Sequence, residues 1–305
     1  MAASSALMTD GAAKNPLARR WWLNLALLAV IAGLGGYAWY RSGKSPDADK
    51  PTLTSVAPAS VQRIEIERPN EETVRLERRD GRWHLTAPVK ARADEFAVEQ
   101  LMRVLGAPID ATVTPAEGGL ARYGLDSPRL TARFDDLELR FGEFHPLKNE
   151  YYVQHGNEVR LIGSRYYAHL AVSYTNLIDS RLLGPEVKPV GFKLPGFALT
   201  LRDGEWRREP GIEALSSDRI NGFVDDWRHA RALKVEKYSG KKPQAQVIIT
   251  IEGAGGERSD ITVGVLAREP ELVLYRADEG LEYHFPQDTA KRLLELDAPP
   301  AKSEE

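Results

Sequence analysis

The sequence predicts an α+β protein, with an N-terminal single transmembrane helix followed by two similar domains of antiparallel β-hairpins with packed helices. Three observations support this prediction. An uncharged apolar run occupies residues 21–40, landmark residues recur at a nearly constant offset, and alternating strand patterns form hairpins with helical patterns between the groups. Because strict β-α-β alternation is missing, antiparallel sheets are favoured over parallel ones.

The repeat is visible in pairs of residues about 123 positions apart. Trp83 in Gly-Arg-Trp recurs as Trp206 in Gly-Glu-Trp, and Tyr152 recurs as Tyr275. Two further pairs have nearly the same offset: Asp94 with Asp218, and Gly142 with Gly264. A unit of about 120 residues is the usual size of one domain. The sequence therefore predicts a first α+β repeat over residues 61–183 and a second over residues 189–297.

The apolar run over residues 21–40 predicts a membrane helix. Twenty helical residues span roughly 30 Å, the thickness of a hydrocarbon core. Aromatic rings lie at both ends of the run, as membrane interfaces favour: Trp21 and Trp22 at one end, and Tyr37, Trp39 and Tyr40 at the other. The alternative is a cleaved signal peptide, but the bulky Trp39-Tyr40-Arg41 fits a small-residue cleavage site badly. We therefore favour an uncleaved anchor whose partner is the lipid bilayer.

The orientation of this predicted helix in the membrane rests on weaker evidence, because basic residues are equally frequent on both sides of the run. Arg19 and Arg20 adjoin the run directly and favour a cytoplasmic tail over residues 1–20. This orientation predicts a single-pass protein of the inner (cytoplasmic) membrane with its main domain in the periplasm. Residues 41–60, rich in Ser, Pro, Asp and Lys, read as a flexible linker, and residues 298–305 as a disordered tail.

The first predicted repeat combines hairpins with one clear amphipathic helix. Asp80-Gly81 is a favoured hairpin dipeptide between two strands. Asp94 has the position of a helix N-cap, and apolar residues follow it at helical spacing from Val98 to Leu105. The predicted strands are 61–67, 73–77, 82–86, 130–134, 137–141, 151–155 and 158–162, and a closing helix covers 164–177.

The second predicted repeat follows the same order. Asp203-Gly204 again joins two strands, and Ile220, Phe223, Val224 and Trp227 form the helical stripe. The predicted strands are 197–202, 205–208, 247–251, 260–265, 272–276 and 281–285, and a short helix covers 290–296.

Two segments of the first repeat resemble a known family. The stretch from Gly81 to Asp94, GRWHLTAPVKARAD, and the stretch from Tyr123 to Pro128, YGLDSP, are similar to the bacterial domain of unknown function numbered 4340. The resemblance covers residues 61–183 well, and the second repeat lacks the YGLD-P element. The motif residues are Trp83, Asp94, Tyr123, Gly124, Leu125, Asp126 and Pro128. The resemblance implies a membrane anchor with an exported repeat domain and an accessory role beside ABC transporter subunits. The family has no established catalytic residues, so none are carried over to this sequence.

Composition and motifs exclude several classes of function. The net charge of −3 with 28% charged residues does not suit nucleic-acid binding, and the absence of cysteine excludes disulfides and thiolate chemistry. His145, His155 and His169 lack metal-ligand spacing. The paired acids Asp135-Asp136 and Asp225-Asp226 fit a hairpin turn and a solvated helix face. We therefore predict no catalytic, cofactor-binding or metal-binding residues and no enzyme activity.

The aromatic pairs Tyr151-Tyr152 and Tyr166-Tyr167 are the candidate ligand or partner surface. Side chains alternate along a strand, so one member of a strand pair should face the core and the other the outside. The preferred function is a non-enzymatic, membrane-anchored scaffold or adaptor of the cell envelope, with membrane proteins such as ABC transporter subunits as partners. The alternative is a periplasmic glycan- or peptide-binding module that uses these tyrosines or a cleft between the repeats. A third hypothesis, an envelope hydrolase, would need residues brought together from both repeats.

Overall fold

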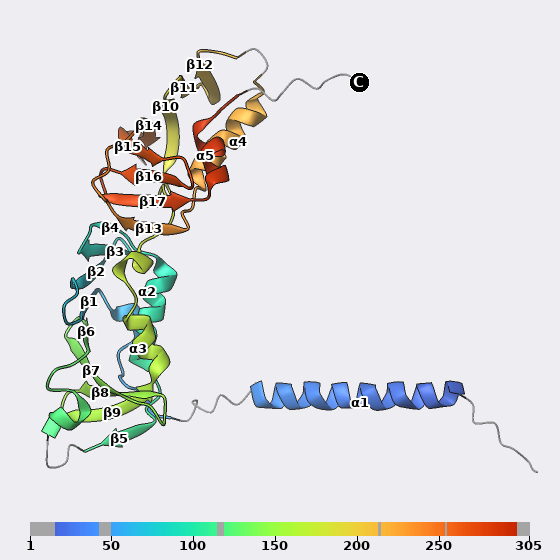
Figure 1. Cartoon of the computed structure of the whole chain (residues 1–305), viewed down its shortest axis with the longest axis vertical. Helices are drawn as coiled ribbons and strands as arrows, with labels where there is room; N and C mark the ends of the chain where they lie inside the picture. Colours follow the sequence, from blue (N-terminus) through green and yellow to red (C-terminus); the bar gives the residue numbers. More distant parts are fainter. Residues whose placement is uncertain (1–15, 43–49, 115–118, 213–214, 254, 298–305) are drawn as a thin grey trace, which may run out of the picture. The chain divides into compact units, whose positions relative to one another are not determined.

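A computed structural model of the 305-residue chain describes residues 16–42, 50–114, 119–212, 215–253 and 255–297 (Figure 1). Most of the predicted cytoplasmic tail, residues 43–49 of the predicted linker and the predicted tail over 298–305 lie outside these ranges. The chain divides into two compact units, Met1–Pro51 and Thr52–Glu305. The first unit contains the helix α1 (Pro16–Ser42), and the second contains both sheets.

The described part of the chain contradicts the predicted membrane helix. Among the residues that the structure describes, no helix is long and apolar enough to cross a membrane. The prediction rested on the length of an uncharged run, and length alone overstates apolar character. Asn24 and the glycines at 33, 35 and 36 contribute little to the free energy of transfer into hydrocarbon.

The predicted α+β class is also wrong, because the second unit consists mainly of two antiparallel sheets with few helices. The helices are short: α2 (Glu95–Met102), α3 (Ser164–Leu170), α4 (Ser217–Arg228) and α5 (Gln287–Leu294). The closing helix predicted over 164–177 ends at Leu170 and is followed by a short 3₁₀ turn, η4 (Tyr174–Leu177). Strand-forming alternation fills most of the remaining sequence, so sheet outweighs helix.

The first sheet has nine strands in the order β4-β3-β2-β1-β6-β7-β8-β9-β5. All of its strand pairs are antiparallel. The strands are β1 (Arg63–Glu67), β2 (Val74–Arg79), β3 (Arg82–Ala87), β4 (Ala91–Arg92), β5 (Ala111–Val113), β6 (Leu130–Phe134), β7 (Leu137–His145), β8 (Glu150–His155) and β9 (Glu158–Gly163).

The second sheet has eight strands in the order β12-β11-β10-β14-β15-β16-β17-β13, again all antiparallel. The strands are β10 (Lys188–Leu194), β11 (Phe197–Arg202), β12 (Glu205–Glu209), β13 (Lys234–Lys237), β14 (Ala245–Glu252), β15 (Arg258–Ala267), β16 (Leu272–Arg276) and β17 (Leu281–Phe285). In each sheet the strand that follows the longest helix of that half forms one edge: β5 lies beside β9, and β13 lies beside β17. The first sheet differs by one added strand, β4, which lies outside β3.

The core lies between the sheets and their helices. Helix α2 buries Val98, Leu101 and Met102, and α4 buries Phe223 and Trp227. The Trp227 indole N–H donates to the Leu293 carbonyl oxygen at 2.9 Å, which ties α4 to α5. One continuous group of buried apolar side chains runs through both halves of the second unit. Because the helices cover one face of the first sheet, polar side chains of that sheet gather on the other face.

Helix caps differ between the two halves. Asp94 caps α2, as the sequence predicts, because its carboxylate accepts a hydrogen bond from the Ala97 N–H at 2.9 Å. Asp218 does not cap α4. Ser216 is the N-cap there, its hydroxyl accepting from the Arg219 N–H at 3.3 Å, and Asp218 lies in the first turn. The two landmark acids therefore have different roles.

Candidate functional site

The open face of the first sheet carries an ordered set of charged side chains, which we call the charged ladder: Glu65, Glu67, Arg75, Arg133, Glu138 and Arg140. It forms because Ile64 and Ile66 of β1 are buried and alternate with Glu65 and Glu67. The strand order then places β1 between β2 and β6, so side chains distant in sequence become neighbours.

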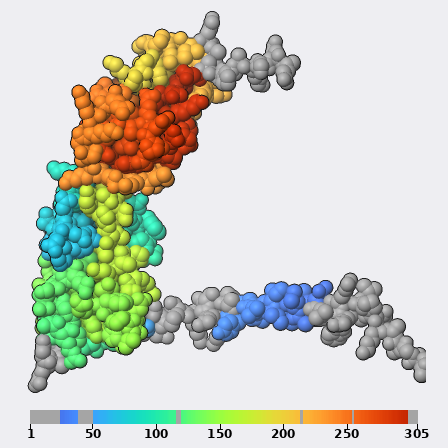
Figure 2. Space-filling view, in the orientation of Figure 1, coloured from blue at the N-terminus to red at the C-terminus, as the bar shows by residue number. Residues whose placement is uncertain are grey.

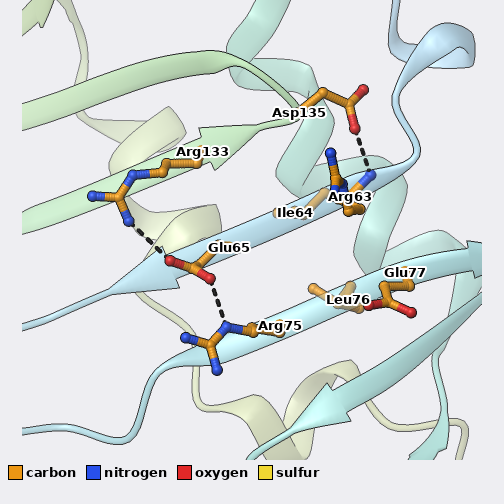
Figure 3. A pocket seen from close by; sticks show the side chains of 8 residues that line it. All are labelled: Arg63, Ile64, Glu65, Arg75, Leu76, Glu77, Arg133 and Asp135. Atoms are coloured by element: carbon orange, nitrogen blue, oxygen red, sulfur yellow. Dashed lines mark hydrogen bonds and ion pairs between the residues drawn. The ribbon is translucent and has the colours of Figure 1, made fainter.

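Glu65 is the centre of the ladder. Its carboxylate accepts a hydrogen bond from Arg75 Nε at 2.6 Å and another from Arg133 Nη1 at 2.9 Å (Figure 3). Arg75 reaches it from β2 and Arg133 from β6, across the registers Glu65↔Arg75 and Glu65↔Arg133. Each charge therefore lies directly opposite a charge of the other sign, the arrangement that cross-strand pairing favours.

Arg133 extends the ladder to β7. Its Nε donates to a Glu138 carboxylate oxygen at 2.9 Å, and its Nη1 lies 2.9 Å from a Glu67 carboxylate oxygen. Arg140 Nε in turn donates to the other Glu138 oxygen at 2.7 Å. Arginines and glutamates thus alternate across four adjacent strands.

A shallow hollow of about 190 Å³ lies over β1, β2 and β6, beside the ladder. Asp135 closes one end of it. This residue occupies the β6–β7 turn with φ of 51°, and its carboxylate accepts from the Arg63 backbone N–H at 2.9 Å (Figure 3). Glu77 of β2 also lines the hollow. The hollow is open to solvent, and the ladder residues that line it, Glu65, Arg75 and Arg133, are already hydrogen-bonded to one another.

Hydrogen bonds within the ladder favour the ionised forms of Glu65, Glu138 and Arg133. The Arg75 hydrogen bond is the main cause that lowers the pKa of Glu65 below its ordinary value. Burial alone would raise the pKa of Glu138, but hydrogen bonds from Arg133 and Arg140 outweigh burial and lower it. The hydrogen bond with Glu67 is the main cause that raises the pKa of Arg133. The ladder is therefore a surface of fixed alternating charge, suited to pairing with charged groups of a partner.

The Tyr123-Gly124-Leu125 motif packs against the far end of the same sheet. Tyr123 and Leu125 are buried and form a small apolar cluster with Val159 of β9. A Cβ on Gly142 would lie 2.0 Å from the Tyr123 carbonyl oxygen, so the motif and β7 approach too closely for any side chain. The contact coincides with an irregularity in the β7–β8 register between Phe141 and Phe144.

The remaining motif residues have structural surroundings. Gly124 has φ of +66°, and a Cβ there would meet Glu143 Cγ at 2.7 Å. Asp126 is exposed and Pro128 is half-buried in the segment that leads to β6. Trp83 is buried, and its backbone N–H donates to the Glu95 carboxylate at 2.8 Å, so the first motif segment links β3 to α2.

The four candidate tyrosines do not form one surface. Tyr151 and Tyr167 stack at 4.1 Å between ring centroids, beside Phe144. Tyr152 lies on the other face of β8, where its ring is 4.9 Å from the ring of Tyr123. Tyr166 stacks with the Arg165 guanidinium at 4.8 Å. All four candidates are half-buried, and their use in ligand binding stays a prediction.

A second charged cluster, which sequence reasoning missed, joins the two sheets. Arg92 beside β3 donates to the Arg181 carbonyl oxygen at 2.6 Å and lies 3.3 Å from a Glu279 oxygen. Arg276 Nη2 lies 3.3 Å from the same Glu279 oxygen, and Arg276 Nη1 donates to the Leu182 carbonyl oxygen at 2.5 Å. In Figure 2 the two halves of the second unit meet without a visible break on the face shown.

The two carboxylates of this junction cluster and Arg276 are deeply buried, whereas Arg92 and Arg181 are partly exposed. Side chains of Arg276 and Glu279 are 5% and 10% exposed, and that of Asp179, which pairs with Arg181 at 2.9 Å, is 3% exposed. Burial is the main cause that raises the pKa of the nearby Tyr283, whose hydroxyl donates to Glu279. Every charge in the cluster has an opposite partner, as buried ions require. The cluster therefore links residues of the first sheet to residues of the second through paired charges.

The histidines and paired acids that the sequence offers do not assemble into a site in the part of the chain that the structure describes. Within the described ranges, no group of three or more His, Cys, Asp or Glu side chains is arranged to hold a metal ion. Asp225 and Asp226 lie on α4 with separate partners, Arg228 and Arg292, each at 3.2 Å. Asp135 is at a hairpin turn, as its sequence context predicts.

The chain is thus a protein of two antiparallel β-sheets, and the open, charge-paired face of the first sheet is its candidate docking surface. The particular family is shown by comparison. The chain belongs to the family described as Domain of unknown function (DUF4340), whose match covers residues 83–243, more than half of the chain. The match begins at Trp83, includes the YGLDSP motif and continues into the second sheet. It therefore extends past residue 183, where the resemblance predicted from the sequence motifs ends. Comparison with curated proteins and with solved structures finds no match.

Proposed function

We propose that this protein is a non-enzymatic adaptor that binds another protein through the charged ladder of its first sheet. The observation that carries the proposal is the alternation of arginine and glutamate across β1, β2, β6 and β7 on an open sheet face. The proposal assumes no membrane span and does not depend on the N-terminal unit.

The ladder suits protein recognition for two physical reasons. Its side chains are already held by hydrogen bonds, so less rotamer entropy is lost when a partner docks. Its charges alternate in sign, so a partner with the reverse alternation gains complementary pairs while other surfaces meet like charges. Single exposed ion pairs contribute little, so the binding we propose depends on the ladder as a set.

The family resemblance suggests which partners to test first. Subunits of an ABC-type transport complex are the first class, because an accessory role beside such subunits is what the resemblance implies. Turnover of generic ester, glycoside or phosphate substrates by the purified chain would contradict the non-enzymatic part of the proposal.

The test is cross-linking and affinity purification of the full chain from its native cells. Arg133→Glu reverses the charge that pairs with Glu65, Glu67 and Glu138, and we expect it to reduce partner recovery at least about tenfold. Arg258→Glu is the matched control, because Arg258 is an exposed arginine on β15 of the second sheet. If both variants recover the partner equally well, or if neither variant recovers it, the result would count against the ladder as the binding surface.

We also infer that the two sheets derive from one duplicated unit. The support is the corresponding strand order and the corresponding positions of landmarks. Trp83 and Trp206 each follow an Asp-Gly turn in which both residues have positive φ. Discovery of family members with one copy of this strand order would support the inference. Unrelated topologies in place of the second sheet across the family would contradict it.

A further inference from the structure

The outer edge of β12 is an open strand edge at the end of the second sheet (Figure 1). Arg202 of β11 and Glu205 of β12 flank the two-residue Asp203-Gly204 turn and are the first residue pair of this hairpin. The closing pair of such a turn is hydrogen-bonded, and bonding alternates along an antiparallel strand. Glu205 and Arg207 therefore direct their backbone N–H and C=O groups toward β11, and Trp206 directs its own outward.

The corresponding position of the first sheet shows how such outward groups are satisfied. The Trp83 carbonyl oxygen accepts from the Ala93 N–H at 3.0 Å, and the Trp83 N–H donates to the Glu95 carboxylate at 2.8 Å. Strand β4 covers β3 at this edge. At Trp206, none of the residues that the structure describes supplies an equivalent partner, and no described strand pairs with the outer edge of β12.

We propose that β12 pairs antiparallel with β12 of a second copy of this chain, with Trp206 opposite Trp206 of that copy. In this register the outward N–H and C=O groups of the two tryptophans bond to each other. Glu205 then lies opposite Arg207 of the second copy, and Arg207 opposite its Glu205. All three residues have the required placement, since Glu205 and Arg207 are exposed on the same face and Trp206 is on the other.

The charges of β12 select this register over its neighbours. A pairing centred on Arg207 would place arginine opposite arginine and Glu205 opposite Glu209, so like charges would oppose each other at three positions. A pairing centred on Arg208 would place two arginines together on the helix-covered face. The five-residue strand makes a small contact, so the dimer is weak and concentration-dependent. This edge belongs to the second sheet, so the inference does not rest on the proposed function.

Disulfide trapping tests the register directly, because the chain has no cysteine of its own. Directly opposed residues have Cα atoms about 4.5–5.5 Å apart, within the range that a disulfide spans. Mixing Glu205→Cys copies with Arg207→Cys copies under mild oxidation should yield disulfide-linked dimers several-fold faster than either variant alone. Equal rates in the mixed and single samples would overturn the proposed register.

Charge reversal tests the same contact without a covalent bond. Sedimentation of the full chain should show that Glu205→Arg and Arg207→Glu each weaken dimerisation by about tenfold or more. An equimolar mixture of the two variants should recover it, because the reversed pairs then match. Association that neither variant changes, or a mixture that stays monomeric, would overturn the proposal.

Discussion

At the scale of single residues, close backbone contacts and fixed charges decide what each position tolerates. Gly142 is the clearest case, because the Tyr123 carbonyl oxygen occupies the space that a Cβ would need. The sequence marks Gly142 only as one of four recurring landmarks. Its physical role depends on the YGLD segment folding back over β7, which no local pattern predicts.

We expect Gly142→Ala to lower the free energy of unfolding by about 1–3 kcal/mol, because the new methyl group forces the motif away from β7. Chemical denaturation measures the change. Gly106→Ala is the control, since no atom lies within 4 Å of a Cβ there. If both substitutions lower the free energy of unfolding by the same small amount, the motif and β7 do not approach as closely as described.

The ladder predicts a dependence of stability on acid. The folded-state pKa of Glu65 lies below its ordinary value of 4.5, so its contribution is present above that pH and is lost as the pH falls through the lower folded value. We expect thermal unfolding between about pH 5 and pH 3 to depend less steeply on pH in Glu65→Gln than in the original chain. An unchanged slope would show that the Arg75 and Arg133 bonds do not stabilise the ionised carboxylate.

At the scale of elements, the sequence predicts strands better than helices or partners. Alternation identifies β1 and β2 because one face of each is buried, and the Asp-Gly turns are visible as dipeptides. The same reasoning extends the closing helix to residue 177, seven residues beyond its end at Leu170. It could indicate that Glu65 faces outward, but not that Arg133 lies beside it, because the β1–β6 pairing joins residues 68 positions apart.

The helix caps provide a test at this scale. Asp94→Ala and Ser216→Ala should each lower the free energy of unfolding by about 1 kcal/mol, because each removes a side chain that accepts from a free helix N–H. Asp218→Ala should cost only a few tenths of a kcal/mol, from its place near the helix dipole. Denaturant titrations of the three variants measure this, and an equal loss at Asp218 would contradict the assigned caps.

At the scale of the whole second unit, buried ion pairs join the sheets, and the family match includes Arg92, Asp179 and Arg181 of this cluster. Arg92 is a member of the first motif segment, which gives that segment a role in assembly as well as in local folding. The sequence could not predict this cluster, because Arg92 and Glu279 are 187 positions apart and look like ordinary surface charges.

We expect Arg276→Met to lower the free energy of unfolding by about 3–5 kcal/mol, because it leaves Glu279 buried beside fewer positive charges. Arg258→Met, at an arginine that is 61% exposed, should change the value by less than about 0.5 kcal/mol. Calorimetry of both variants would make the comparison. A similar, small effect at the two sites would mean that the cluster does not hold the sheets together.

The central claim is that the open face of the first sheet binds a protein partner, and site-specific photo-crosslinking in native cells measures it most directly. A photoreactive residue in place of Glu77, which lines the hollow beside the ladder, should capture a discrete partner. The same residue in place of Arg258 on the second sheet should not. Capture at residue 258 with none at residue 77 would contradict the claim.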